Sequence, residues 1–257
     1  MDESYDMRPI LLPKSTKLNW AHVYRELATK DDIHAITQRE DADKTDRIMN
    51  SVIGRLPASR SILDIGCGDG RLLRDMDAEV RVGTVISEEE VARLRVFHEG
   101  KSIEFVVADI ETLDLGRTFD LICTIAILSH LPSKKAVRRA LRAIRSASVV
   151  DGHLYVGVLP QIEATPKRHH STLRAIGFVR RTCGIKVTLG FICHLWKRRH
   201  RMGYYEAPRL PQFAARADAF VALADECGFE LVEQWNCANF GTDDDRQRMD
   251  YLFRRKF

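Results

Sequence analysis

The chain has 257 residues, of which 45% are hydrophobic, and a formal net charge of +4 at pH 7. This length allows one large α/β domain with an insertion, and the apolar content is sufficient for a buried core. No apolar run approaches the length of a membrane span, and the acidic start MDESYD is unlike a signal peptide. The six cysteines include no Cys-x-x-Cys pair, so we expect reduced thiols, no metal site and a cytoplasmic protein.

The chain begins with a stretch expected to be loosely ordered, over residues 1–18, followed by helices over residues 19–55. Apolar residues in the helical part recur three and four positions apart, as on the buried face of a helix. We expect residues 1–55 to form an N-terminal helical cap and residues 56–257 to form the main domain.

Short apolar strands alternate with amphipathic helices from residue 61 onward. Strands are predicted over residues 61–65, 80–86, 103–108, 119–125, 153–159, 229–235 and 249–253. This alternation is typical of a parallel, doubly wound sheet. Asp151-Gly152 is expected to turn the chain into the fifth strand. Residues 160–211 break the rhythm and are interpreted as an insertion, after which a helix over residues 211–227 is predicted to bury Phe213 and to end at Gly228.

The most informative stretch is DIGCGDG, residues 64–70, which follows an apolar strand and precedes a helix start. Its three glycines at alternate positions allow a tight turn and the close approach of a ligand to the backbone. The helix start adds unpaired N–H groups and a positive dipole end. The spacing differs from the G-x-G-x-x-G dinucleotide fingerprint, and the Gly-Lys-Ser/Thr of a Walker loop is absent. The alternative is a turn that binds no ligand, but three glycines lower the stability of the folded state unless the backbone must approach a ligand closely.

This loop resembles motif I of the class I S-adenosylmethionine (SAM) methyltransferases, and the resemblance extends over roughly residues 45–257. It implies a Rossmann-like sheet of seven strands, mostly parallel with an antiparallel C-terminal strand, a lid inserted after strand five, and SAM as cofactor. Residues that would contact the methionine part and ribose of SAM are Asp64, Gly66, Cys67, Gly68 and Gly70. Asp109 would accept a hydrogen bond from the adenine amino group, with Ile110 beside the ring. Thr124 and Ala126 would line the site near the methyl group.

The second strand departs from the family pattern. Val85 stands where the family usually has an acid that binds both ribose hydroxyls. The stretch over residues 83–90 is similar to the cyclopropane-fatty-acid-synthase branch, in which a polar residue one helical turn later takes over. By position this is Glu90, or alternatively Glu89, with Ile86 and Ser87 beside the cofactor. The alternative interpretation is a solvated first helical turn capped by Ser87.

Methyl transfer requires alignment of the reacting atoms and exclusion of water more than covalent chemistry by the protein. A hydroxyl acceptor would also need a base. His130, in the stretch LSHLP just beyond strand four, is the candidate for this catalytic role, although the family often keeps a His-Leu-Pro here for structural reasons. His169, His170 and His194 in the insertion are the alternatives.

The insertion carries an uneven charge. Between Glu163 and Glu206 there are ten Lys or Arg residues and no acid. Aromatic residues that could contact a substrate are Tyr24, Trp196, Tyr204 and Tyr205. Such a lid could hold an anionic acceptor, lie on an anionic membrane surface or bind RNA. The fourth interpretation is an ordinary lid whose basic side chains face water.

The sequence therefore predicts a cytoplasmic SAM-dependent methyltransferase that acts on a small-molecule or carrier-linked acceptor, first of all a sugar or secondary-metabolite hydroxyl. An RNA methyltransferase is the first alternative, but an Asn/Asp-Pro-Pro-Tyr motif and a catalytic cysteine motif are absent. A SAM-binding protein without catalysis is the second alternative, because Val85 replaces the acid that usually binds the ribose hydroxyls in this family.

Overall fold

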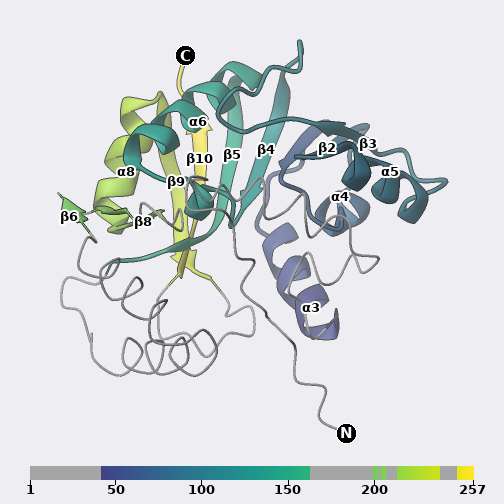
Figure 1. Cartoon of the computed structure of the whole chain (residues 1–257), viewed down its shortest axis with the longest axis horizontal. Coiled ribbons are helices and arrows are strands. Elements are labelled where there is room, and N and C mark those ends of the chain that lie inside the picture. Colours follow the sequence, from purple (N-terminus) through teal and green to yellow (C-terminus); the bar gives the residue numbers. More distant parts are fainter. Residues whose placement is uncertain (1–41, 163–198, 202–203, 207–212, 238–247) are drawn as a thin grey trace, which may run out of the picture.

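The computed structural model describes residues 42–162, 199–201, 204–206, 213–237 and 248–257. Its centre is a seven-stranded sheet with the strand order β3-β2-β1-β4-β5-β10-β9 (Figure 1). The strands are β1 (Ser61–Ile65), β2 (Val80–Val85), β3 (Glu104–Val107), β4 (Phe119–Ile125), β5 (Ser148–Pro160), β9 (Phe229–Asn236) and β10 (Arg248–Arg255). Strands β1 to β5 pair in parallel, and β10 is antiparallel to both of its neighbours. The predicted Rossmann-like sheet with an antiparallel C-terminal strand is confirmed.

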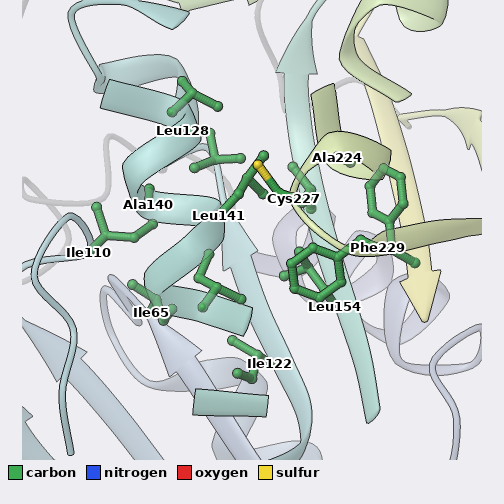
Figure 2. Packing of buried hydrophobic residues seen from close by; sticks show 14 of the residues in the cluster. Ile65, Ile110, Ile122, Leu128, Ala140, Leu141, Leu154, Ala224, Cys227 and Phe229 are labelled. Atoms are coloured by element: carbon green, nitrogen blue, oxygen red, sulfur yellow. The ribbon is translucent and has the colours of Figure 1, made fainter. Parts of the chain in front are cut away.

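Helices cover both faces of this sheet (Figure 1). They are α3 (Ala42–Ile53), α4 (Arg71–Asp75), α5 (Glu88–Phe97), the 3-10 helix η1 (Leu128–His130), α6 (Lys134–Ala147) and α8 (Ala217–Glu226). Helices α6 and α8 share one hydrophobic core with the sheet, and α3, α4 and α5 share a second core on the opposite face. Figure 2 shows the first core, where Leu141 of α6 and Cys227 after α8 meet above the sheet.

Helix α6 illustrates how the sequence sets the packing. Ser133 caps it by accepting a hydrogen bond from the Ala136 N–H. Val137, Leu141 and Ile144 lie three and four positions apart and are fully buried, as their spacing predicts. The basic side chains of α6 are exposed or half-buried, so the helix turns an apolar face toward the sheet and a basic face away from it.

The segment before α8 corrects the sequence interpretation. Phe213, predicted to lie on the inner face of a helix over residues 211–227, instead begins the short strand β8 (Phe213–Ala215). This strand pairs antiparallel with β7 (Tyr204–Glu206), which pairs with β6 (Arg199–Arg201). The helix itself begins only at Ala217, and Gly228 ends it with φ 88°, as predicted. A short apolar run buried at every position fits a strand and a helix equally well, which is why periodicity did not separate them.

The fifth strand is longer than predicted. Asp151-Gly152 was expected to be the turn that precedes it, but β5 begins at Ser148 and runs through both residues. Asp151 has φ 60°, and the pairing of β4 with β5 shifts register between Phe119 and Leu121. The turn signal therefore marks an irregularity inside the strand, because Asp tolerates a left-handed conformation better than most residues.

Several predictions fall outside the described residues. These are the helices over residues 19–41, Tyr24, Trp196 and most of the basic insertion, and the side chains of Tyr204 and Tyr205 also lie outside them. The division into a cap over residues 1–55 and a main domain over residues 56–257 stays a prediction. Within the described part of the chain, no helix is both long and apolar enough to span a membrane.

Candidate functional site

The candidate site lies at the edge of the sheet where β1, β2 and β4 end. Ile65, the last residue of β1, pairs with Thr84 of β2 and with Thr124 of β4. The glycine loop over residues 66–70 therefore leaves the sheet between the ends of two parallel strands. Open α/β sheets bind their ligands beyond the carboxyl ends of such strands.

All three glycines of this loop are left-handed. Gly66, Gly68 and Gly70 have φ values of 69°, 57° and 71°, a region that other residues enter only at a cost. A Cβ atom on Gly66 would lie 2.4 Å from the Ile127 Cδ1 atom, so the loop also packs closely on the chain after β4. The Cys67 N–H donates to the Thr84 carbonyl oxygen at 3.0 Å. The loop thus needs glycine for its shape and for its contacts.

Two buried carboxyl groups converge beside this loop. Asp64, the residue before the last in β1, is 3% exposed, and Glu90 is 8% exposed. Both lie near Cys67: burial raises the pKa of the Cys67 thiol well above its usual value, and the charges of Asp64, Glu90 and Asp69 raise that pKa further. The structure therefore brings together Asp64, Cys67 and Glu90, and it keeps the thiol protonated and unsuited to nucleophilic work.

The turn after β2 positions Glu90. Ser87 caps α5 by accepting a hydrogen bond from the Glu90 N–H at 3.2 Å, and Glu90 Oε2 accepts one from the Ile86 N–H at 3.3 Å. Burial raises the pKa of Glu90, and the bonds from Ile86 and Ser87 oppose that rise. Glu89 is exposed, whereas Glu90 is buried, so the geometry favours Glu90 over Glu89 and over a solvated first turn. Its role as a ribose ligand stays a prediction.

Asp109 lies just beyond β3 and is exposed. Its Oδ1 atom accepts a hydrogen bond from the Glu111 N–H at 2.8 Å, which fixes the carboxyl group at the end of the strand. Ile110 is buried in the core beneath α6, as Figure 2 shows. The adenine contacts of both residues stay predictions.

The end of β4 is strained. Thr124 is fully buried, and its Oγ1 atom has no hydrogen-bond partner within the described part of the structure. Ala126 has φ 62°, its N–H donates to the Gly157 carbonyl oxygen at 2.9 Å, and its own carbonyl oxygen accepts from Ser129 Oγ at 2.6 Å. Left-handed alanine is uncommon, and such strain clusters at functional sites.

A buried acid at the same edge was missed by the sequence analysis. Asp250 of β10 is 1% exposed and accepts hydrogen bonds from the Val158 N–H at 2.7 Å and from the Tyr155 hydroxyl at 3.0 Å. Burial raises its pKa, and bonds from Val158, Tyr155, Cys237 and Trp235 oppose that rise. The signal was present in the sequence, since an acid inside the apolar run MDYLF is costly unless several donors meet it.

His130, the proposed base, is the last residue of η1. Burial and the nearby Arg248 lower its pKa from 6.5 to about 4. The imidazole is therefore neutral at physiological pH, and one ring nitrogen keeps its lone pair.

Comparison with known proteins decides the family. Residues 62–152, which include the glycine loop, Glu90, Asp109 and His130, match the model of a methyltransferase domain family. Residues 62–152 form a methyltransferase domain, and the similarity supports a class I SAM-dependent methyltransferase.

Three relatives show the range of this methyltransferase's similarity. Nodulation protein S from Sinorhizobium fredii is 29% identical over 150 residues, covering 55% of this chain and 67% of the relative. A dTDP-4-amino-2,3,4,6-tetradeoxy-D-glucose N,N-dimethyltransferase from Saccharopolyspora spinosa is 27% identical over 44% of this chain and 45% of its own length. A ubiquinone biosynthesis O-methyltransferase from Vibrio campbellii is 30% identical over 39% of this chain and 44% of its own length. The aligned region thus spans less than half of the last two proteins.

A solved structure resembles the methyltransferase over nearly its whole length. N-methyltransferase NodS from Bradyrhizobium japonicum WM9, in complex with S-adenosylhomocysteine (SAH), matches with a TM-score of 0.59 at 17% identity. The match covers 93% of this chain and 99% of NodS, and it shows a shared fold.

The residues at the site fit SAM. The cofactor carries an ammonium group, a sulfonium and two ribose hydroxyls, and buried carboxylates such as Asp64 and Glu90 complement cations and hydroxyl donors. Thr124 offers a buried hydroxyl at the same edge. The left-handed glycine loop lets a ligand lie against the backbone without a side chain between them. The residues present therefore fit SAM as the cofactor of this methyltransferase domain.

Proposed function

We propose that this methyltransferase modifies a hydroxyl group of a small-molecule or carrier-linked acceptor, a sugar or a secondary metabolite in the first place. Asp64, Glu90, Asp109 and the loop over residues 66–70 would hold SAM, which supplies an activated methyl group. The observation that carries the choice of a hydroxyl is the neutral, half-buried imidazole of His130 beside the end of β4.

The low pKa of His130 suits a hydroxyl acceptor. A free hydroxyl is a weak acid, but its proton becomes strongly acidic once the oxygen begins to bond to carbon. A neutral imidazole can take up that proton late in the reaction even when its own pKa is about 4. Until then, the ring can accept a hydrogen bond from the hydroxyl and align its oxygen.

An amine acceptor is the second candidate, because two of the similar proteins are named as N-methyltransferases. An amine that arrives protonated must lose a proton before its nitrogen can react. A base whose pKa is about 4 leaves an ammonium ion protonated, so His130 would contribute little to this reaction. The two acceptor types therefore predict different effects of removing the His130 ring: a loss of activity with a hydroxyl acceptor and little change with an amine acceptor.

The test is a transfer assay with radiolabelled SAM against three matched acceptor panels: nucleotide sugars with free hydroxyls, the corresponding amino sugars, and polyprenylated catechols. Transfer RNA serves as a fourth panel for the alternative that the sequence left open. We expect label on a hydroxyl compound, and mass spectrometry of the product locates the methyl group. His130→Gln should lower kcat by about 10²–10⁴-fold, the range ascribed to general-base catalysis, while SAH affinity is retained.

A different pattern would overturn the proposal. Label on amines alone, with His130→Gln as active as the parent, would establish N-methylation. Label on RNA alone would assign another substrate class. SAH binding without transfer to any panel or to fractionated cell extract would indicate a protein that binds SAM without catalysis.

A further inference from the structure

The ring of His98 contacts the glycine loop from the side of α5. His98 follows the last turn of that helix, where its backbone N–H donates to the Leu94 carbonyl oxygen at 2.9 Å, and it is only 5% exposed. Its Nε2 atom lies 2.7 Å from the carbonyl oxygen of Asp69. Because a carbonyl oxygen can only accept, Nε2 carries the proton and donates this hydrogen bond.

This bond fixes one side of a peptide group whose other side is also bonded. The Asp69 carbonyl accepts from His98, and the N–H of the same peptide, on Gly70, donates to the Cys67 carbonyl oxygen at 2.9 Å. Gly70 has φ 71°. Glycine populates positive and negative φ about equally, so a peptide beside it can rotate at little cost when nothing holds it. The two bonds remove that freedom.

Two phenyl rings and the glycine loop pack against the imidazole. The His98 ring centroid lies 5.0 Å from that of Phe97 and 5.4 Å from that of Phe105. A Cβ atom on Gly70 would lie 2.7 Å from His98 Nε2 and 3.2 Å from Phe105 Cε1. The loop therefore rests directly on the imidazole, and its third glycine is required by that contact.

We propose that His98 is a positioning residue for the cofactor: by holding the Asp69–Gly70 peptide in one orientation, it keeps the loop over residues 66–70 in the shape that binds SAM. A ligand binds a loop that is competent only part of the time with an affinity reduced by that fraction. If loss of the bond leaves the competent orientation populated about one part in ten, the apparent Kd rises about tenfold. The proposal rests on SAM binding at this loop and does not depend on the acceptor.

Three substitutions separate the hydrogen bond from mere filling of space. In His98→Gln the side-chain amide nitrogen takes the place of Nε2 and can still donate to Asp69. In His98→Asn the amide is one atom shorter and reaches only the place of Nδ1. In His98→Leu an apolar group fills the buried space between the phenyl rings and donates nothing. Titration calorimetry with SAH measures the Kd of each variant, and thermal unfolding measures its stability.

We expect His98→Asn and His98→Leu to raise the SAH Kd at least tenfold and His98→Gln to stay within about threefold of the parent. The Gln and Asn variants are similar in polarity, so a general loss of stability would not separate their affinities. The proposal is overturned if all folded variants bind SAH like the parent, or if Gln weakens binding as much as Leu. If the parent itself fails to bind SAH, the cofactor assignment is at fault.

Discussion

The N–H of Val158 donates a hydrogen bond to Oδ1 of Asp250 at 2.7 Å, and it does so while Val158 has φ 62°. A left-handed β-branched residue is strained by about 1–2 kcal/mol. Ala126, which directly follows the neighbouring strand β4, has the same φ of 62°, and its N–H donates to the Gly157 carbonyl oxygen at 2.9 Å. The ends of β4 and β5 are thus both bent at the edge that carries the cofactor loop.

The first prediction follows from this pair. Asp250→Ala should destabilise the protein by about 1–3 kcal/mol, because it removes the acceptor from a buried N–H. In a Val158→Gly background the same change should cost less, since glycine adopts positive φ without strain. Urea unfolding of the two single variants and the double variant measures the coupling free energy, expected to exceed about 0.5 kcal/mol. Strictly additive costs would show that Asp250 does not hold the bend.

The second prediction concerns the glycine loop. Gly68→Val should abolish measurable SAH binding, because a branched residue is strained at φ 57° and its side chain would lie where the ligand approaches the backbone. Gly116→Ala is the matched control: Gly116 also has a positive φ, 63°, but a Cβ atom there meets no atom within 4 Å. Calorimetry with SAH compares the two, and circular dichroism checks that both are folded. Equal affinities in both variants would remove the loop from the cofactor site.

A third prediction concerns the acids at the ends of β2 and β3. Asp109→Ala and Glu90→Gln should each weaken SAH binding, by about 1–3 kcal/mol for the lost hydrogen bonds to a carboxylate. Glu88→Gln, in the exposed part of the same helical turn as Glu90, should leave the affinity unchanged. Calorimetry with SAH, at one pH and one salt concentration, compares the affinity of each variant with that of the parent. An effect of Glu88→Gln as large as that of Glu90→Gln would point to long-range charge instead of contact.

The fourth prediction is a pH dependence of stability. Folded His130 takes up its proton near pH 4, whereas the unfolded chain does so near pH 6.5. Between these values the unfolded state binds more protons, so stability falls as the pH falls through this window, by at most about 3 kcal/mol from this group. His130→Gln should therefore reduce the loss of stability on acidification.

The measurement is the free energy of unfolding of parent and variant between pH 4 and 7.5. Burial lowers the pKa of His153 as well, so His153→Gln serves as a second reference. The raised pKa values of Glu90 and Asp250 have the opposite effect and stabilise the folded state as the pH falls. The effect of His130 is therefore read from the difference between the stability curves of parent and variant, and not from the parent curve alone. Parallel curves for parent and His130→Gln would contradict the prediction.

The sequence predicted the sheet and the glycine loop because both depend on local patterns. The predicted strand β4 and the predicted cap Ser87 coincide with the structure, since apolar runs and helix caps act over a few residues. The acid within the apolar run MDYLF was a visible signal, but the contacts of Asp250 and His98 were not predictable, because their partners Val158 and Asp69 are 92 and 29 positions away. Phe213 was misassigned because its strand is only three residues long.

The position of β10 has a consequence for how the sheet forms. This strand pairs with β5, so that Arg254 lies opposite His153 and Arg248 lies opposite Pro160. The paired residues are far apart in the sequence. Strand β10 separates β5 from β9, so until β10 is in place β9 has no strand partner in this sheet and β5 is paired only with β4. Pairing over so long a stretch of chain raises the contact order and slows folding. Until it occurs, β5 presents an unpaired apolar edge, which makes this step the stage at which the nascent protein is most prone to aggregate.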